Sequence, residues 1–320
     1  MDYIFTVFAQ IVILFVLIAV GFVLARTRLV DVDGAKQMTN ILFYVVTPAV
    51  IIDAMRQAEL SVRSGGLLLT GGAAAAVSFV VCIPISMLMF RKSEANRGTV
   101  LRFATVFPNA GFYSLPLVKG LCGNDGVLVC SAFIVVFNMV AFTYGISRFE
   151  RGVGLKKVLL NPGTASLLIG FALLLVKEFM PASVFQPTYF LSGANPSSLL
   201  TTPLSLVAGL NTPVAMFITG IHLNNVSLKF GRADLDMFAA SFMRLAVLPW
   251  AAVGICYALG IRGESLMAAA VPIFAPTAAN TVMFATKYGG DANTAARMLP
   301  LTTLISGLTM PLMLGMVHLL

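Results

Sequence analysis

Charge is scarce in this chain of 320 residues, because Asp, Glu, Lys and Arg make up only 11% of it while apolar residues make up 58%. A soluble domain usually carries about 25% charged residues. The mean hydropathy of +0.93 points the same way. The composition therefore excludes an ordinary soluble protein and predicts an all-α polytopic membrane protein.

The chain also lacks the short motifs of common enzymes. It has no GxxxxGK[ST] loop for ATP, no HExxH helix for zinc and no GxSxG nucleophile elbow. Its four cysteines show no CxxC spacing, which is typical of small buried apolar residues. We therefore expect no enzymatic activity, no cofactor and no metal site, and any uphill transport would have to use an ion gradient or the membrane potential.

The apolar residues are grouped into continuous stretches long enough to cross a membrane as helices, which takes about 20 residues. The strands of an outer-membrane barrel would instead show alternating apolar and polar residues. The first stretch has no basic segment before it, so we expect a mature helix rather than a signal peptide. Ten stretches are predicted at residues 4–26, 38–56, 65–90, 99–121, 126–147, 162–181, 199–222, 237–259, 264–286 and 294–318.

The basic residues are distributed unevenly between the loops that join these stretches. Of the 21 Lys and Arg residues, 15 fall at odd-numbered loops, 5 at even-numbered loops and one inside a stretch. By the positive-inside rule, the odd-numbered loops lie on the cytoplasmic side of a cell membrane and both termini lie on its outer side. Because this pattern accounts for the net charge of +8, we expect no nucleic-acid partner.

Two of the stretches are interrupted in their middle by a proline beside small polar residues. They read Val106-Phe-Pro-Asn-Ala-Gly and Phe274-Ala-Pro-Thr-Ala-Ala-Asn, with Pro108 and Pro276 separated by 168 residues. A proline removes a backbone donor, and in a membrane such a break persists only where protein buries it or where it lines a cavity. Paired breaks of this kind predict the binding site of a transporter.

A second matched pair supports a division into two halves. Thr47-Pro48 and Thr212-Pro213 lie 165 residues apart, each near the middle of a stretch. The halves would comprise residues 1–150 and 151–320 and meet in the basic loop at 148–161. With five stretches in each half, the second half enters the membrane inverted. For Pro48 and Pro213 two interpretations stay open: a structural kink in the helix, or a supporting role near the binding site.

The polar residues around the two breaks are uncharged, so an acidic substrate would be bound by helix dipoles and amide groups. Asn138 in stretch 126–147 either lines the same cavity or forms a hydrogen bond between helices. The predicted substrate-binding residues are Pro108, Asn109, Ser114, Pro276, Thr277, Asn280 and Asn138, with Thr47, Pro48, Thr212 and Pro213 in support.

Charged residues within the stretches have less central predicted roles. Asp53 and Arg56 are three residues apart near an outer helix end, which indicates an interfacial pair, with proton coupling by Asp53 as the alternative. Arg244 lies about two turns into its stretch from the cytoplasm. We expect its side chain to extend to that interface, with a role in gating the substrate as the alternative.

The motifs together resemble those of the auxin efflux carrier family, which includes plant PIN-type auxin carriers and bacterial malate or malonate carriers. The resemblance covers nearly the whole chain. It rests on Gly21 before a basic loop, Thr47-Pro48-Ala49, Phe107 through Leu117, Asn161-Pro162, Asn211-Thr212-Pro213 with Gly220, Leu245 to Pro249, and Pro276 through Asp291. Thr277 stands where plant carriers tend to have glutamine, which argues against an auxin-like substrate. The loop at 148–161 is short and lacks the long hydrophilic insert of many plant members, which favours a prokaryotic carrier.

The resemblance implies a fold like that of bile-acid/sodium symporters, in which the fourth and ninth helices are broken and cross. Helices 1, 2, 6 and 7 would form a scaffold, and helices 3–5 and 8–10 a moving transport domain. The predicted function is transport of small organic anions by an elevator mechanism. Two features are left open: coupling to Na⁺ or H⁺, and assembly as a homodimer. The alternatives are a sodium-coupled symporter of a larger amphipathic anion, a channel and a membrane sensor.

Overall fold

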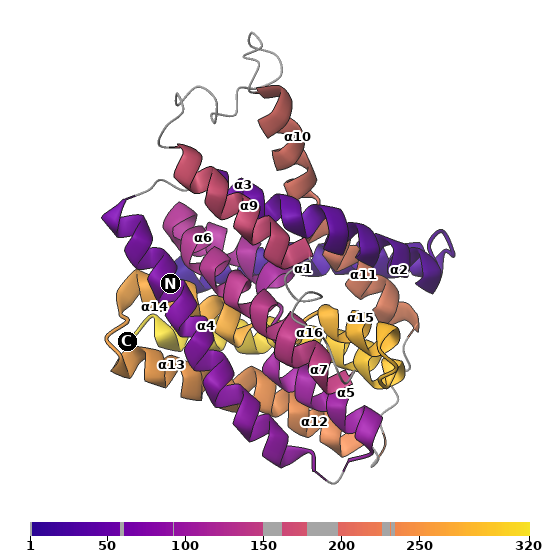
Figure 1. Cartoon of the computed structure of the whole chain (residues 1–320). Helices are drawn as coiled ribbons and strands as arrows, with labels where there is room; N and C mark the ends of the chain where they lie inside the picture. The colour runs from indigo at the N-terminus through magenta and orange to yellow at the C-terminus, as the bar shows by residue number, and fades with distance from the viewer. Residues whose placement is uncertain are drawn as a thin grey trace.

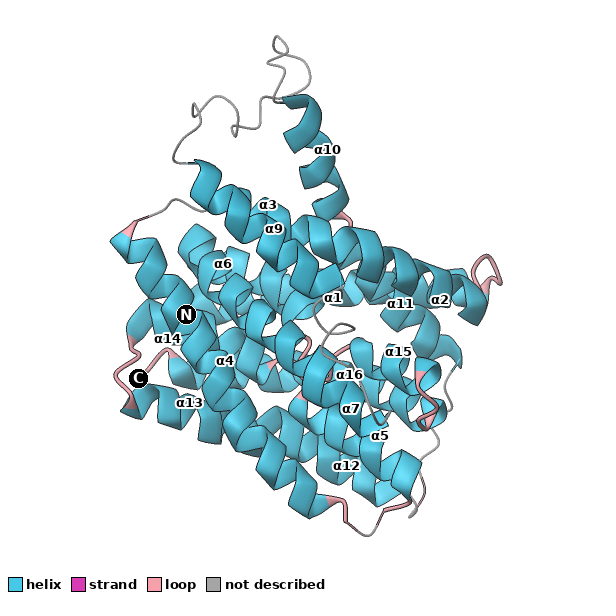
Figure 2. Cartoon of the chain, viewed as in Figure 1, coloured by secondary structure: helices cyan, strands magenta, loops and turns pink. Residues whose placement is uncertain are grey.

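The computed structural model describes residues 2–57, 61–91, 93–149, 162–177, 198–225, 231 and 234–320. Within these residues the chain is helical throughout, and the only extended pairing is an isolated bridge between residues 108 and 277 (Figure 2). The all-α prediction is therefore confirmed for the described part of the chain.

The helices follow the predicted stretches closely. They are α1 Asp2–Arg26, α2 Val32–Ile41, α3 Thr47–Gln57, α4 Val62–Met89, α5 Ala95–Val106, α6 Leu115–Val140, α7 Ile146–Phe149, α9 Pro162–Lys177, α10 Ser198–Gly209, α11 Asn211–Asn225, α12 Leu235–Phe242, α13 Leu248–Ala258, α14 Gly263–Phe274, α15 Asn280–Lys287 and α16 Ala292–Val317. Wider π-helical turns join some of them: η1 Leu42–Val46, η2 Ala110–Ser114, η3 Ala141–Gly145 and η6 Met243–Val247. The predicted boundary between the halves falls mostly on 150–161, outside the described residues.

Six helical segments of the described chain are long and apolar enough to cross a membrane. They are Val32–Asp53, Val62–Met89, Ala110–Phe149, Thr201–Asn224, Leu235–Ala258 and Ala292–Val317. The third has 40 residues, about 60 Å of helix, which is roughly twice the thickness of the hydrocarbon core. Its direction changes at Gly123, whose φ of 58° and ψ of −149° lie outside the helical region. This change falls between the predicted stretches 99–121 and 126–147, while the count of ten crossings stays a prediction.

The π-helical turns explain how two of the predicted spans keep a proline in their interior. Turn η1 comes directly before Thr47-Pro48, and turn η6 before Leu248-Pro249. A proline has no N–H group for the carbonyl four residues earlier. A turn with i→i+5 bonding shifts the pairing by one residue, so the helix passes the proline without ending. Both segments therefore remain continuous through their prolines.

The helices form two groups by their packing (Figure 1). Helix α1 packs along α11, and α3 packs on α9 and α10. Helix α4 packs on α6 and α13, and α14 packs on α6. Two glycines let α1 and α11 approach closely, since a Cβ at Gly21 would lie 2.2 Å from the Phe217 carbonyl oxygen and one at Gly220 would lie 2.0 Å from the Ile18 carbonyl oxygen. Neither position admits a larger residue without separating α1 from α11.

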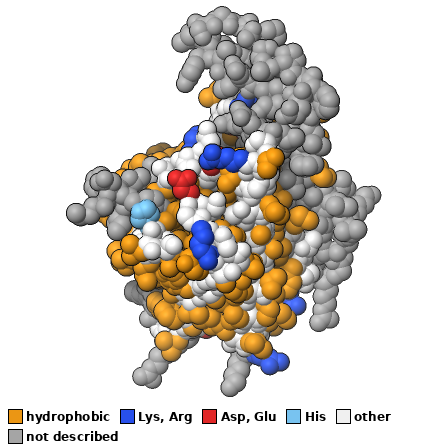
Figure 3. Space-filling model, turned by 90° about the vertical axis from the view of Figure 1, so that its left-hand side faces the viewer, with side chains coloured by type: hydrophobic (Ala, Val, Ile, Leu, Met, Phe, Trp, Pro, Cys, Tyr) orange, Lys and Arg blue, Asp and Glu red, His pale blue; other side chains and the backbone are white. Residues whose placement is uncertain are grey.

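Hydrophobic side chains cover much of the described outer surface. Figure 3 shows one face on which they predominate and charged side chains are few. Along α4, for example, Leu69, Val80 and Leu88 are 74%, 72% and 66% exposed. Such a large exposed apolar surface is unfavourable in water and suits contact with lipid. The surface is therefore that of a protein embedded in a bilayer.

A group of four charged residues ties the N-terminal ends of three helices together. We call Arg97, Asp234, Asp236 and Arg297 the end network. Arg97 donates to Asp236 at 2.6 and 2.8 Å, and Arg297 donates to both oxygens of Asp234 at 2.8 and 3.0 Å. These hydrogen bonds from Arg297 lower the pKa of Asp234 to about 2. The network joins α5 to α12 and α16, which belong to different predicted halves of the chain.

Candidate functional site

Both predicted helix breaks are present, and they cross each other. Helix α5 ends at Val106 and α14 ends at Phe274, each two residues before its proline. Pro108 and Thr277 form an antiparallel bridge, in which the N–H of Asn109 donates to the Pro276 carbonyl at 2.7 Å. The N–H of Ala278 donates to the Phe107 carbonyl at 2.9 Å. We call residues 107–110 and 275–280 the crossover.

Thr277 supplies a hydrogen bond that Pro108 removes. In an unbroken helix the Ala104 carbonyl would accept from the N–H of residue 108, but proline has none. The Thr277 hydroxyl donates to this carbonyl at 3.0 Å instead, and its own N–H donates to Thr302 Oγ1 at 3.2 Å. Thr277 is fully buried. Its side chain therefore holds the two breaks together, and direct contact with a substrate stays a prediction.

Asn109 begins the second half of the first broken segment. Its Oδ1 accepts from the Phe112 N–H at 3.3 Å, which caps turn η2. Its carbonyl accepts from the Ser114 hydroxyl at 3.2 Å. No described residue accepts from its Nδ2, although the residue is only 4% exposed. Asn109 therefore keeps an unused donor inside the crossover, whereas the Ser114 hydroxyl is already engaged.

The second broken segment resumes at Asn280, the first residue of α15. The residue before it, Ala279, provides no side-chain cap. The Asn280 side chain is partly exposed and forms no hydrogen bond with a described residue. The N–H groups of Thr281 and Val282 donate to the carbonyls of Ala278 and Ala279, and this helix end carries the positive end of a helix dipole. The structure thus brings Asn109 and Asn280 to the N-terminal ends of the two resumed helices.

The expected position of Arg244 is wrong. Its side chain does not extend to the interface, since it is 0% exposed and is the largest fully buried side chain among the described residues. Its Nη1 donates to the carbonyls of Thr105 and Val106 at 3.3 and 3.2 Å, and its Nη2 donates to the carbonyl of Ile273. These carbonyls lie in the last turns of α5 and α14. The guanidinium therefore contacts both broken helices at their C-terminal ends.

The remaining predicted site residues are distributed around the crossover. Asn138 of α6 is 5% exposed, and no described residue accepts from its buried Nδ2. The Thr47 hydroxyl is likewise buried without a partner in the described chain. Pro48 follows turn η1, and Thr212 and Pro213 lie in the first turn of α11, where a proline removes no helical hydrogen bond.

Sequence reasoning missed Asn211 as a contact of the crossover. Helix α10 ends at Gly209 and α11 begins at Asn211, so the predicted stretch 199–222 is itself interrupted. The Asn211 Nδ2 donates to the Gly111 carbonyl in η2 at 3.1 Å, and the residue is 5% exposed. The available signal was an asparagine in mid-stretch directly before Thr-Pro, where a polar side chain needs a partner.

The predicted pair of Asp53 and Arg56 is confirmed, but the pair is buried rather than interfacial. The carboxylate and guanidinium meet at 2.7 Å, and the residues are 8% and 4% exposed. Ser205 of α10 donates to the same carboxylate oxygen at 2.9 Å. The pair therefore joins α3 to α10, and its ionic groups already have partners.

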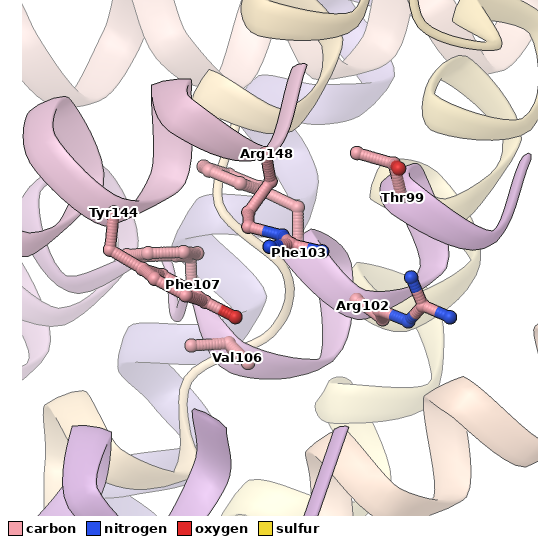
Figure 4. Close-up of a pocket in the computed structure, with 7 residues that line it drawn as sticks. All are labelled: Thr99, Arg102, Phe103, Val106, Phe107, Tyr144 and Arg148. Carbon is pink, nitrogen blue, oxygen red and sulfur yellow. The ribbon is translucent and has the colours of Figure 1, made fainter. Parts of the chain in front are cut away.

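A cavity opens beside the first broken segment (Figure 4). The enclosed space is small, about enough for one water molecule. Its lining comes from α5, η3 and α7 and consists of Thr99, Arg102, Phe103, Val106, Phe107, Tyr144 and Arg148. Arg102 donates to the Phe90 carbonyl at 2.6 Å, and the Arg148 guanidinium lies 6.0 Å from the centre of the Tyr144 ring.

Phe107 is part of this lining. It is fully buried and stacks on Phe103 with ring centres 4.2 Å apart. Phe79 and Phe137 also contact its ring, at 5.4 and 5.8 Å. Aromatic pairs of this kind each stabilise a structure by about 0.5–1.5 kcal/mol beyond their burial. The aromatic cluster therefore fixes the residue before Pro108.

Comparisons with known proteins show the family of the chain. The family described as "Membrane transport protein" matches residues 6–157 and 151–314. An uncharacterized transporter of Methanothermobacter thermautotrophicus is 23% identical over 314 residues, covering 93% of this chain and 94% of that protein. Another, from Methanocaldococcus jannaschii, is 24% identical over 314 residues, covering 94% and 96%. The chain belongs to the membrane transport protein family, the family of the auxin efflux carriers, whose members are membrane transporters rather than enzymes.

Proposed function

We propose that this transporter is a secondary carrier of small organic anions, in which the crossover binds the carboxylate of the substrate. The observation that carries the proposal is the antiparallel crossing of two broken helices at Pro108 and Thr277. In secondary transporters, broken helices of this kind build the substrate site, because their free ends supply donors and acceptors inside the membrane.

The chemistry at the crossover favours an anion. Asn109 and Asn280 have amide donors that no described residue uses, and they lie at the positive ends of η2 and α15. The buried guanidinium of Arg244 contacts the C-terminal ends of both broken helices. A carboxylate would gain hydrogen bonds from the amides and a favourable field from the dipoles, whereas a cation would meet repulsion.

The cavity supports an approach path for such a substrate from the predicted cytoplasmic side. Arg102 and Arg148 line it and would attract an anion. Phe107, which directly precedes Pro108, is fully buried and lines the same pocket. Movement of the aromatic cluster would connect the cavity with the site, which alternating access requires.

The packing supports an elevator-type movement of one helix group against the other. The proposed scaffold contains α1, α2, α3, α9, α10 and α11, and the proposed transport domain contains α4 to α7 and α12 to α16. The two groups pack mainly within themselves. The hydrogen bond from Asn211 to Gly111 joins them beside the crossover. It would have to break and re-form in each transport cycle.

The proposal includes the inverted arrangement of residues 1–150 and 151–320 and the placement of both termini outside the cell membrane. The support is the positive-inside pattern and the matched positions of the breaks. Reporter fusions at the two ends, expressed in a bacterial host, test the orientation. Periplasmic activity at both ends is expected, and cytoplasmic activity at either end contradicts it.

Uptake into proteoliposomes tests the function. The full chain is reconstituted and assayed with radiolabelled acetate, malonate, malate and succinate. We expect uptake of at least one acid, reduced about tenfold or more by Asn109→Ala and by Asn280→Ala, because a hydrogen bond to a charged group contributes about 1.5–3 kcal/mol.

Asn293→Ala is the matched control for the two substitutions. Asn293 is an exposed residue in the first turn of α16, away from the crossover. We expect its uptake to equal that of the unmodified chain. Unchanged uptake in both crossover variants would place the substrate elsewhere and end the proposal.

A further inference from the structure

Arg244 completes the hydrogen bonding of the two broken helices at their C-terminal ends. In continuous helices, the carbonyls of Thr105, Val106 and Ile273 would accept from the N–H groups four residues later. Those N–H groups are engaged elsewhere, because residues 109, 110 and 277 donate to the Pro276 carbonyl, the Pro108 carbonyl and Thr302 Oγ1. The three carbonyls are left without helical partners, and the guanidinium of Arg244 contacts all three.

The charge of Arg244 is balanced by these carbonyls rather than by an acid. Among the described residues, no carboxylate forms an ion pair with it. An arginine remains protonated in proteins, and a buried charge needs compensation. The C-terminal end of a helix carries about half a negative charge, so two such ends together offset about one positive charge. The crossover thus contains a cation held between two helix ends.

This position is one that a metal ion can take in other carriers. In transporters with broken helices, unwound carbonyls and the C-terminal ends of half-helices coordinate the coupling Na⁺. Here the corresponding carbonyls of α5 and α14 are already occupied by Nη1 and Nη2 of Arg244. A sodium ion at the same place would meet a guanidinium, which repels it.

We propose that Arg244 is the resident cation of the crossover, taking the place of a coupling Na⁺ between the ends of α5 and α14, so that the chain binds its anion without sodium. The part of this inference that concerns the anion rests on the proposed function. The part that concerns the cation does not, because it depends only on which group occupies the carbonyls. Arg244 acts as a positioning residue that neutralises the negative C-terminal ends of α5 and α14, which lie just before the two breaks.

Arg262 provides a matched control within the same chain. It too donates to carbonyls at a helix end, those of Tyr257 and Ile261 after α13, and it lies over the ring of Tyr257. It differs from Arg244 in being exposed and in lying at the N-terminal cap of α14, so that its side chain contacts the C-terminal end of neither broken helix. Removal of Arg262 therefore deletes a similar set of contacts without opening a cation site.

The test is the apparent melting temperature of the purified full chain in detergent, measured without any carboxylic acid. Sodium, potassium and choline chlorides are compared at equal ionic strength. We expect the unmodified chain to melt at the same temperature in all three salts, since its cation is covalently attached. Stabilisation by sodium alone would show an open sodium site and overturn the proposal.

Chemical rescue supplies the second readout. We expect Arg244→Ala to melt at a lower temperature, and millimolar guanidinium to raise it again by at least about 2 °C, because a ligand that binds the folded state stabilises it. The same guanidinium should not stabilise Arg262→Ala or the unmodified chain. Failure of guanidinium to restore Arg244→Ala would show that the side chain acts by packing alone, against the proposal.

If Arg244→Ala does not fold, Arg244→Lys is measured in its place. Its ammonium keeps a positive charge at the carbonyls, so we expect continued indifference to sodium. Stabilisation of this variant by sodium would overturn the inference. None of these measurements requires transport, so failure of the carboxylate assay and failure of the cation assignment would be seen separately.

Discussion

The crossover and the end network both use arginine to connect distant parts of the chain, but they balance its charge differently. In the end network, two arginines (+2) meet two aspartates (−2), so the sum of the four charges is zero. In the crossover, Arg244 meets only carbonyl groups. The end network is therefore suited to a structural tie, whereas in the crossover two helix ends offset the charge of Arg244 and the amide donors of Asn109 and Asn280 stay unused.

The largest effect on stability is expected where the crossover loses a hydrogen bond that nothing else can replace. Thr277→Val would leave the Ala104 carbonyl without its donor, since Pro108 has no N–H to offer. An unsatisfied buried group costs about 1–3 kcal/mol. The measurement is the free energy of unfolding in mixed micelles of a mild detergent and SDS.

Ser114→Ala is the comparison for Thr277→Val. The Asn109 carbonyl that it serves also accepts from the N–H groups of Tyr113 and Ser114, both at 3.3 Å. The loss should stay near the usual value for one hydrogen bond, about 0.5–1.5 kcal/mol. Equal losses in the two variants would contradict the view that Thr277 replaces a bond removed by proline.

A smaller effect, dependent on pH, is expected from the end network. The pKa of Asp234 is about 2 in the folded chain and 3.8 without its partners. The unfolded chain therefore binds this proton more readily, so the stabilisation is complete above about pH 4 and is lost as the pH falls towards 2. Melting temperatures measured across that range should fall more steeply for the unmodified chain than for Asp234→Asn. Parallel curves would contradict the role of Asp234.

The smallest effect is expected from the exposed pair of Arg63 and Asp125. Their charged groups meet at 2.5 Å, but the side chains are 77% and 42% exposed. Surface pairs of this kind contribute about 0–1 kcal/mol and are weakened by salt. Arg63→Gln should therefore change the unfolding free energy within that range. A larger change would contradict the expectation that an exposed pair stabilises the fold less than the contacts of a buried arginine.

The position of the site could be predicted from the sequence because its cause is local. Pro108 and Pro276 each prevent a hydrogen bond within their own helix, and lipid provides no replacement. Asn109 was predicted from its place beside the proline, and the structure puts it at the start of η2. The pairing of Asp53 with Arg56 followed from their spacing of three residues, but their burial under α10 did not.

The role of Arg244 could not be predicted because it depends on the convergence of three helices far apart in sequence. Hydropathy locates a charged residue by depth along its own helix and says nothing about which neighbours its side chain reaches. The one available signal was the cost of an arginine inside an apolar stretch, about 2.5–3.5 kcal/mol near the middle of a membrane. Asn211 was missed for a related reason, since its acceptor Gly111 lies 100 residues earlier.

The contacts of Arg244 have a consequence for the order in which the chain is made. Its side chain is synthesised 139 residues after Thr105, and the Thr277 hydroxyl follows Ala104 by 173 residues. During synthesis, the first broken helix therefore enters the bilayer before the groups that will pair with its carbonyls exist. A nascent chain that stopped before Arg244 and Thr277 would hold an incomplete break in lipid, so the first broken helix matures only when these later residues arrive.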